Sequence, residues 1–297
     1  MPGIDAGRLV YHNRITTGRE EPIMADNQLR IMIFGAHPDD CDLCFGATAM
    51  KYSALGHKVK FISMTNGNTG HFSMGGGSLA RRRYDEAQAA AQVAGIEYEI
   101  WDIPNGELMA DLATRWQTVK SIREYRPDMV ACHRSNDYHP DHRAVGQLVQ
   151  DSMYTIGIPN IMPLTEPLRK APVLTYLNDS FTEPFPYRVD IAVDIDDVFD
   201  RLVEMLSCHV SQFFEWLAWD RGELDEVPED ESGRKEWLAE QMRTRYGTQA
   251  DRGREKLVEL YGEEHGSQVK HAQLLMISEY GRQPTAEELA ALVPFLP

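Results

Sequence analysis

The sequence predicts an α/β fold: a Rossmann-like, doubly wound and mostly parallel sheet with a helical C-terminal extension. Short apolar runs typical of buried strands alternate with longer amphipathic stretches typical of helices. Four such strand–helix units follow one another from Leu29. Consecutive units of this kind place helices on both faces of a parallel sheet.

The first of these units starts with the apolar run IMIF, and glycines end its helix and the next one, at Gly56 and Gly95. A glycine-rich loop, residues 66–78, separates the second strand from its helix. The predicted elements are, in order, strand 29–36, helix 46–56, strand 57–65, helix 79–95, strand 97–103, helix 108–125, strand 127–133 and helix 139–157.

After Gly157 the alternation loosens through a proline-rich stretch. Two further strands are predicted, over residues 173–179 and 187–195, and then a helix from Asp196 to Trp219. An acidic stretch rich in helix breakers reads as a solvated loop, and two or three helices follow it. We therefore predict three parts: an N-terminal arm (1–28), the α/β domain (29–219) and the acidic loop with its helical extension (220–297).

Composition excludes several classes of partner. The 297 residues carry 30 Lys and Arg against 46 Asp and Glu, a formal net charge of −16. Nucleic-acid binding requires clustered positive charge, so it is not expected. No apolar run approaches the roughly 18–20 residues of a membrane span, and no hydrophobic signal core opens the chain, so we expect no membrane span and a cytoplasmic location. The four cysteines are expected to be reduced, and a homo-oligomer is left open.

Two histidine–aspartate clusters follow the first and fourth predicted strands: HPDD, residues 37–40, and HPDH, residues 139–142. In a doubly wound sheet these strands can be neighbours, so their carboxyl ends would bring the clusters together. Catalytic zinc takes three protein ligands from imidazole and carboxylate groups and keeps one position for water. We predict that His37, Asp40 and His142 hold one Zn²⁺ per chain.

The remaining members of the clusters are predicted to act in catalysis. Asp39, next to a ligand, is free to take a proton from the attacking water. His139 faces the same cavity as a proton donor or oxyanion stabiliser, with Asp141 holding its tautomer. The alternative is that each His-Pro-Asp triplet only caps a helix, because aspartate accepts hydrogen bonds from free backbone amides there.

The motifs AHPDD, RYDE and HPDH resemble the PIG-L/LmbE-like family of zinc-dependent N-deacetylases, and CHVSQ at residues 208–212 resembles a further motif of that family. The resemblance covers roughly residues 29–215. It implies removal of acetyl from N-acetylglucosamine units, with His37, Asp40 and His142 on zinc, Asp39 as base and His139 facing the oxyanion.

The resemblance also implies substrate contacts. Arg83, the first residue of RYDE, matches an arginine that contacts the sugar. Asn105 stands where many members have an aspartate that binds sugar hydroxyls, and Cys41 replaces the glutamate that usually follows HPDD. On spacing alone, Arg83 fits equally well a surface pair with Glu86 one turn along its helix.

We therefore predict a metal-dependent hydrolase that removes an N-acetyl group from a small-molecule aminosugar conjugate. Three alternatives stay open: an amidase on a thiol-sugar conjugate, a non-catalytic Rossmann-like binding protein, and a redox protein using the Cys41-x-x-Cys44 pair. Trp216 and Trp219, at helical spacing, are read as core or interface rather than as a sugar platform.

Overall fold

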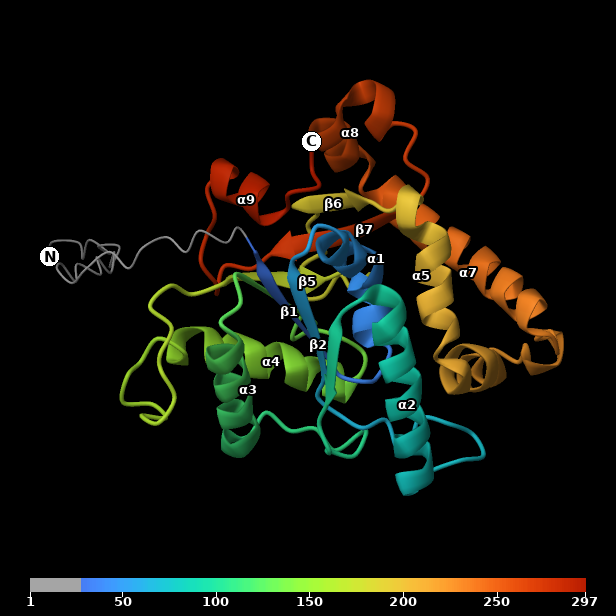
Figure 1. Cartoon of the computed structure of the whole chain (residues 1–297), viewed down its shortest axis with the longest axis horizontal. Coiled ribbons are helices and arrows are strands. Elements are labelled where there is room, and N and C mark those ends of the chain that lie inside the picture. The colour runs from blue at the N-terminus through green and yellow to red at the C-terminus, as the bar shows by residue number, and fades with distance from the viewer. Residues whose placement is uncertain (1–27) are drawn as a thin grey trace, which may run out of the picture.

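A seven-stranded sheet runs through the molecule in the order β3-β2-β1-β4-β5-β7-β6 (Figure 1). The computed structural model describes residues 28–297, so the predicted arm lies outside the described residues except for Gln28. The strands are β1 Arg30–Gly35, β2 Lys58–Ser63, β3 Glu97–Ile100, β4 Met129–Cys132, β5 Val173–Leu177, β6 Ile191–Asp194 and β7 Ala272–Ile277.

Strands β1 to β5 run parallel to one another, which confirms the predicted mostly parallel α/β sheet. The helices are α1 Asp40–Ala54, α2 Gly76–Ala94, α3 Leu112–Tyr125, α4 Pro140–Thr155, α5 Phe199–Ser207, α6 Leu217–Asp220, α7 Glu231–Arg252, α8 Arg254–Gly266 and α9 Ala286–Leu292. A π-helical turn, Ser211–Trp216, joins α5 to α6.

Strand β1 lies inside the sheet, between β2 and β4, and it is apolar on both faces. Ile31 and Ile33 belong to the core on one side of the sheet, and Met32 and Phe34 to the core on the other. Alternate side chains of a strand point to opposite faces, so a continuous apolar run fits only a strand covered on both sides. Helices α1, α2, α5 and α7 cover one face, and α3 and α4 cover the other (Figure 1).

Strand β7 departs from the prediction. It lies within the segment predicted to be helical, and it pairs antiparallel with both β5 and β6. Its sequence, AQLLMI, is built from residues that favour helices, but both of its edges find strand partners and most of it is buried. Part of the predicted C-terminal extension is therefore an inner strand of the sheet.

Helix α1 also differs, since it starts at Asp40 and not at the predicted Gly46. Gly46 lies inside the helix, where an added Cβ would come within 3.0 Å of Leu202 and Met205 of α5. The glycine therefore serves close packing of α1 on α5 and does not mark a helix end. The earlier start places the last residue of HPDD in the first turn of α1.

Gly146, in the second turn of α4, lets this helix lie directly against the loop after β4. A Cβ at this position would stand 2.7 Å from backbone atoms of Arg134 and Ser135. Backbone cannot move aside as a flexible side chain can. The predicted ligand His142 lies one turn earlier on the same helix, so this close approach also sets the position of HPDH.

Replacing Gly146 by alanine is expected to lower the free energy of unfolding by about 1–3 kcal/mol, the usual cost of overpacking. Gly247→Ala in α7 is the matched control, because the only heavy atom near its added Cβ is a carbonyl oxygen at 3.7 Å. The control should be neutral or stabilising, as glycine-to-alanine changes in helices are. Urea unfolding of both variants measures the difference, and equal effects would contradict the packing argument.

Candidate functional site

The loop after β1 carries a carboxylate turned back onto its own backbone. Asp40 Oδ2 accepts hydrogen bonds from the backbone N–H groups of Ala36, at 2.9 Å, and His37, at 2.7 Å. Asp39, the residue before α1, makes no side-chain capping bond. The helix-capping alternative therefore does not account for the HPDD cluster.

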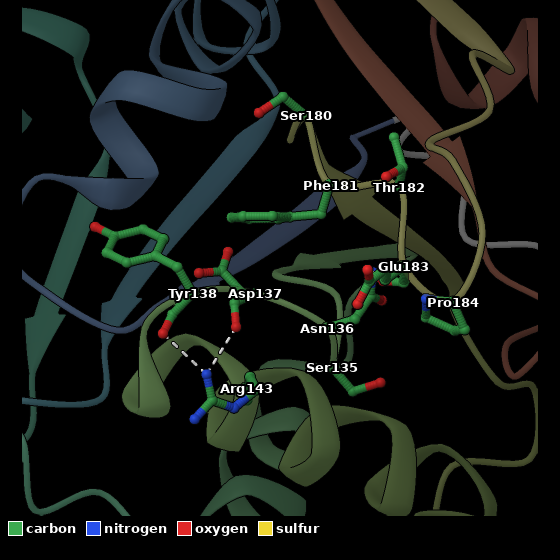
Figure 2. A pocket seen from close by; sticks show the side chains of 10 residues that line it. All are labelled: Ser135, Asn136, Asp137, Tyr138, Arg143, Ser180, Phe181, Thr182, Glu183 and Pro184. Atoms are coloured by element: carbon green, nitrogen blue, oxygen red, sulfur yellow. Dashed lines mark hydrogen bonds between the residues drawn. The ribbon is translucent and has the colours of Figure 1, made fainter.

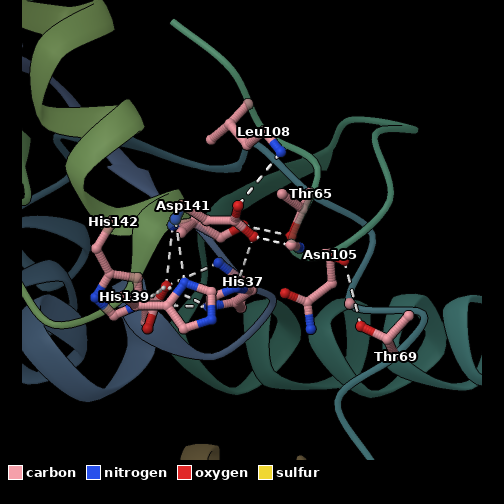
Figure 3. Close-up of polar contacts among 12 residues, drawn as sticks. His37, Thr65, Thr69, Asn105, Leu108, His139, Asp141 and His142 are labelled. Carbon is pink, nitrogen blue, oxygen red and sulfur yellow. Dashed lines mark hydrogen bonds and ion pairs between the residues drawn. The ribbon is translucent and has the colours of Figure 1, made fainter.

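The three predicted metal ligands converge on one point. His37 Nδ1 lies 3.4 Å from Asp40 Oδ2, His142 Nε2 lies 3.5 Å from the same oxygen, and the two nitrogens are 3.4 Å apart. The pairing of β1 with β4 brings them together, because each strand ends beside the other and the two clusters follow directly. Figure 3 shows the rings of His37, His139 and His142 gathered beside Asp141.

This triangle fits a zinc ion. Zinc bonds of about 2.0–2.1 Å in a tetrahedron require ligand atoms about 3.3 Å apart, close to the separations found here. Two further groups of possible metal ligands share residues with this triangle, and within each group the ligand atoms lie within 4.8 Å of one another. These groups are His37, His139 and His142, and Asp40, His133 and His142. The donor set, two imidazoles and a carboxylate with more imidazoles beside them, is one that zinc accepts.

Each histidine of the triangle has a carboxylate on its other ring nitrogen. His37 Nε2 lies 3.2 Å from Asp141 Oδ2, and His142 Nδ1 lies 3.2 Å from Asp137 Oδ1. Such partners orient a metal-binding imidazole and raise its basicity. This corrects the prediction for Asp141, whose carboxylate holds His37 and not His139.

Protonation in the metal-free protein follows from these partners. Burial alone would lower the pKa of His37, but hydrogen bonds to Asp141 and Asp40 raise it to about 9. Burial would raise the pKa of Asp40, yet His142 and His133 hold it well below its usual range. At neutral pH a metal must therefore displace a proton from His37, so metal binding releases acid.

His139 differs from His37 and His142 in its hydrogen-bond partner, which is a backbone N–H and not a carboxylate. It caps α4, with Nδ1 accepting the hydrogen bond of the backbone N–H of Asp141 at 3.1 Å. Burial and the neighbouring His37 lower its pKa. A neutral ring that accepts at Nδ1 carries its proton on Nε2, so His139 is a hydrogen-bond donor. HPDH therefore does cap α4, but the capping residue is His139 and not the aspartate that the alternative assumed.

His133 and Asp137 were not singled out from the sequence. His133 stacks on His142 with ring centroids 4.0 Å apart, and its Nε2 lies 3.4 Å from Asp40 Oδ2. Both residues lie between the end of β4 and HPDH. The signal for Asp137 was present, because a ligand histidine needs an acceptor for its second nitrogen and this carboxylate precedes the motif.

Arg83 lies against the predicted base, and its sugar contact stays a prediction. Its side chain is 2% exposed, its Nη2 lies 3.2 Å from Asp39 Oδ1, and it donates to the backbone oxygens of Pro38 and Gly67. The alternative pair with Glu86 is wrong, since Glu86 binds Arg82 and Ser211. Arg83 therefore positions the predicted base.

Asn105 lies beside this cluster, and Figure 3 shows its amide next to His37. Its backbone N–H donates to Asn68 Oδ1 at 3.0 Å. Its Oδ1 has no hydrogen-bond partner among residues 28–297. The amide oxygen can accept a bond from a substrate, and the sugar contact stays a prediction.

The Cys41-x-x-Cys44 pair does not have the character of a redox centre. Burial raises the pKa of Cys41 well above its usual value and that of Cys44 to about 12. Reactive pairs need the opposite, a thiol whose pKa is lowered toward neutrality. The redox alternative is therefore disfavoured.

Trp216 and Trp219 form part of an aromatic stack on the loop after β2. Phe72 stacks on Trp219, and Trp219 on Trp216, each with centroids 5.4 Å apart. His71 stacks on Phe72 in turn. Trp219 is 47% exposed, but the neighbouring rings stack on it and on one another. Trp219 is therefore not a core residue, and its interface role stays a prediction.

Replacing Asp137 by asparagine is expected to weaken metal binding roughly 10- to 100-fold, the usual effect of removing an outer carboxylate. Asp151→Asn on α4, the helix that carries His142, is the matched control, since this carboxylate is partly exposed and pairs with Arg115 at 3.5 Å, away from the ligands. Competition with a chelating dye measures both affinities. Unchanged affinity in the Asp137 variant would show that His142 needs no carboxylate partner.

Residues 32–153 match the family described as PIG-L, GlcNAc-PI de-N-acetylase. The chain is 27% identical over 203 residues to a diacetylchitobiose deacetylase of Thermococcus kodakarensis, covering 64% of this chain and 73% of the relative. It is 23% identical over 211 residues to a 4-oxalmesaconate hydratase of Pseudomonas putida, covering 68% and 81%.

Among solved structures, the fold is similar to N,N'-diacetylchitobiose deacetylase from Pyrococcus horikoshii, with a TM-score of 0.64, 22% identity and 84% of each chain covered. That likeness supports the fold. The family match covers the three motifs, since all of them lie within residues 32–153. Together they confirm the resemblance predicted from AHPDD, RYDE and HPDH, over the matched residues 32–153.

Proposed function

We propose that this protein is a zinc-dependent hydrolase that removes an N-acetyl group from an aminosugar conjugate. The observation that carries the proposal is the triangle of His37 Nδ1, Asp40 Oδ2 and His142 Nε2, with sides of 3.4–3.5 Å. The carboxylate of Asp39 precedes one of these ligands directly in the chain. The deacetylase among the relatives supports amide hydrolysis as the reaction and an acetylated aminosugar as the substrate.

Zinc, when bound, polarises the acetyl carbonyl and makes a nearby water more acidic. Asp39 takes the proton of the attacking water, and Arg83 holds this carboxylate in place through the 3.2 Å ion pair. Because Arg83 is buried, the pair is screened from solvent more weakly than a surface pair would be.

His139 and Asp39 then divide two tasks. The neutral ring of His139 donates from Nε2 to the oxygen that becomes negative in the tetrahedral intermediate. Asp39, having gained a proton, returns it to the leaving amine. This division follows from the capping bond at Nδ1 of His139, which leaves one ring nitrogen to face the substrate.

A thiol-sugar conjugate remains an alternative substrate within this proposal, since cleavage of its amide bond needs the same chemistry. Among residues 28–297 no helix is long and apolar enough to cross a membrane. The cytoplasmic location and zinc as the physiological metal belong to the proposal.

Zinc-reconstituted protein is expected to release acetate from N-acetylglucosamine conjugates, and a chelator should abolish the release. The panel contains N-acetylglucosamine, N,N'-diacetylchitobiose, an N-acetylated thiol-sugar and an unsaturated diacid. Acetate detection reads the first three, and loss of double-bond absorbance reads the fourth. Hydration of the diacid without acetate release would instead favour the reaction of the hydratase relative.

Asp39→Asn is the control for that assay, because it is nearly isosteric with the parent residue. It should keep the metal and the fold and lose on the order of 10²–10⁴ in turnover, the usual value of general base catalysis. Turnover within a few-fold of the parent would remove Asp39 from the mechanism.

Arg83→Met is expected to lower turnover about 10- to 100-fold on a sugar substrate and on a sugar-free N-acetyl amide alike, because it frees the base from its position. Arg83→Lys, which keeps the charge, should recover part of the loss. Steady-state kinetics of both substrates on both variants measure this. A rise in KM confined to the sugar substrate would instead support the direct sugar contact implied by the family resemblance.

A further inference from the structure

The loop after β2, residues 64–75, packs against the side chain of Arg83. Cβ atoms added at Gly67 and Gly70 would stand 2.5 and 3.0 Å from Nη1 of this arginine. The backbone oxygen of Gly67 also accepts a hydrogen bond from the same nitrogen. Because Arg83 pairs with Asp39, a displacement of this loop would free the guanidinium that holds the proposed base.

The same loop also fixes the position of Asn105. The backbone N–H of Asn105 donates to Asn68 Oδ1 at 3.0 Å, and its carbonyl oxygen accepts from Thr69 Oγ1 at 3.3 Å (Figure 3). The side-chain amide of Asn105 lies next to His37 in that view. The loop after β2 therefore supports both the partner of the proposed base and the predicted sugar contact.

Two side chains of the π-helical turn after α5 hold this loop. Gln212, which is 3% exposed, donates from Nε2 to the backbone oxygen of Gly70 at 3.0 Å. Glu215 Oε2 lies 2.8 Å from His71 Nε2. Nδ1 of this imidazole accepts from two backbone N–H groups of its own loop, each at 3.1 Å, so Nε2 carries the proton and donates it to Glu215.

The π-helical turn is itself anchored to α2. Arg82 binds both carboxylate oxygens of Glu215, at 2.8 and 2.6 Å. Ser211 donates its backbone N–H and its hydroxyl to the two oxygens of Glu86, at 2.9 and 2.6 Å. Burial would raise the pKa of Glu215, but hydrogen bonds from Arg82 and the imidazole lower it, so this carboxylate is charged at neutral pH. The turn, the helix and the loop therefore form one hydrogen-bonded unit.

The loop after β4 is held in a different way (Figure 2). Arg143, on the helix that follows this loop, donates from Nη1 to the carbonyl oxygens of Asp137 and Tyr138, at 2.7 and 2.9 Å. These partners are six and five positions away in the chain. The loop after β2 depends instead on side chains 142 and 144 positions away, in a segment outside the matched residues 32–153.

We propose that Gln212 and Glu215 are positioning residues for the proposed deacetylation, because they fasten the loop after β2 against Arg83 and Asn105. The inference rests on the proposed function, since the support of Asp39 matters for turnover only if this carboxylate is the base. It also gives a role to the CHVSQ motif, whose last residue is Gln212.

The first test is hydrogen–deuterium exchange of the full chain. Glu215→Ala should raise the exchange rate of the amides in residues 66–75 about 5-fold or more, because the loop loses one of its attachments. Glu215→Gln keeps an acceptor for His71 and should stay within about twofold of the parent. Glu223→Ala is the matched control, since this carboxylate pairs with Arg221 at 2.6 Å, and it should leave the exchange of the loop unchanged.

The second test is turnover of the zinc-reconstituted variants on a sugar substrate and on a sugar-free N-acetyl amide. Glu215→Ala should lower turnover about 10-fold or more on both substrates, because the base loses its fixed position, while zinc affinity stays within about twofold. Glu215→Gln should recover most of this loss. Gln212→Met removes only the hydrogen bond to Gly70 and should lower turnover about 3- to 10-fold.

Unchanged exchange in Glu215→Ala and Gln212→Met, or faster exchange with the turnover of the parent, would overturn the inference. A loss of zinc affinity as large as the loss of turnover would also overturn it, since the effect would then reach the metal ligands. Acetate release by the parent protein is measured separately. Faster exchange in the variants of a parent that releases no acetate would support the attachment of the loop and reject deacetylation, so the two failures are distinguishable.

Discussion

The parallel pairing of β1 with β4 is the constraint on which the site depends. Phe34 lies opposite Cys132 near the ends of the two strands, so the loops that follow start side by side at one edge of the sheet. Every predicted ligand lies in one of these loops or in the first turn of the helix that follows it. The carboxylate of Asp40 is largely buried there at a cost that the surrounding histidines offset, and a bound cation would offset it further.

Much of this arrangement could be predicted because its signals are local. Apolar runs, amphipathic helices and the two clusters are each contained in short stretches, and the strand order follows from few rules. Strand β7 could not be predicted in this way. Its residues favour a helix, and only pairing with β5 and β6, about 80–100 residues away in the chain, makes it a strand.

The errors within the site have a different cause. Spacing tells which side chains share a helix face but not which element packs against that face. Arg82 and Arg83 are adjacent in the chain and point in different directions, so Arg82 takes Glu86 and Arg83 takes Asp39. In the same way Asp141, two residues from His139, turns its carboxylate to His37, which is 104 residues away in sequence.

The partners of the histidines explain how one residue type takes several roles in a small volume. His37 and His142 each face a carboxylate, which keeps their rings electron-rich and suited to hold a cation. His139 faces a backbone N–H, which makes it an acceptor at Nδ1 and leaves Nε2 as a donor. The sequence shows three histidines that look equivalent. The fold distinguishes them by giving two rings an acceptor and the third ring a donor. In the proposed mechanism this difference separates metal binding from stabilisation of the developing oxyanion.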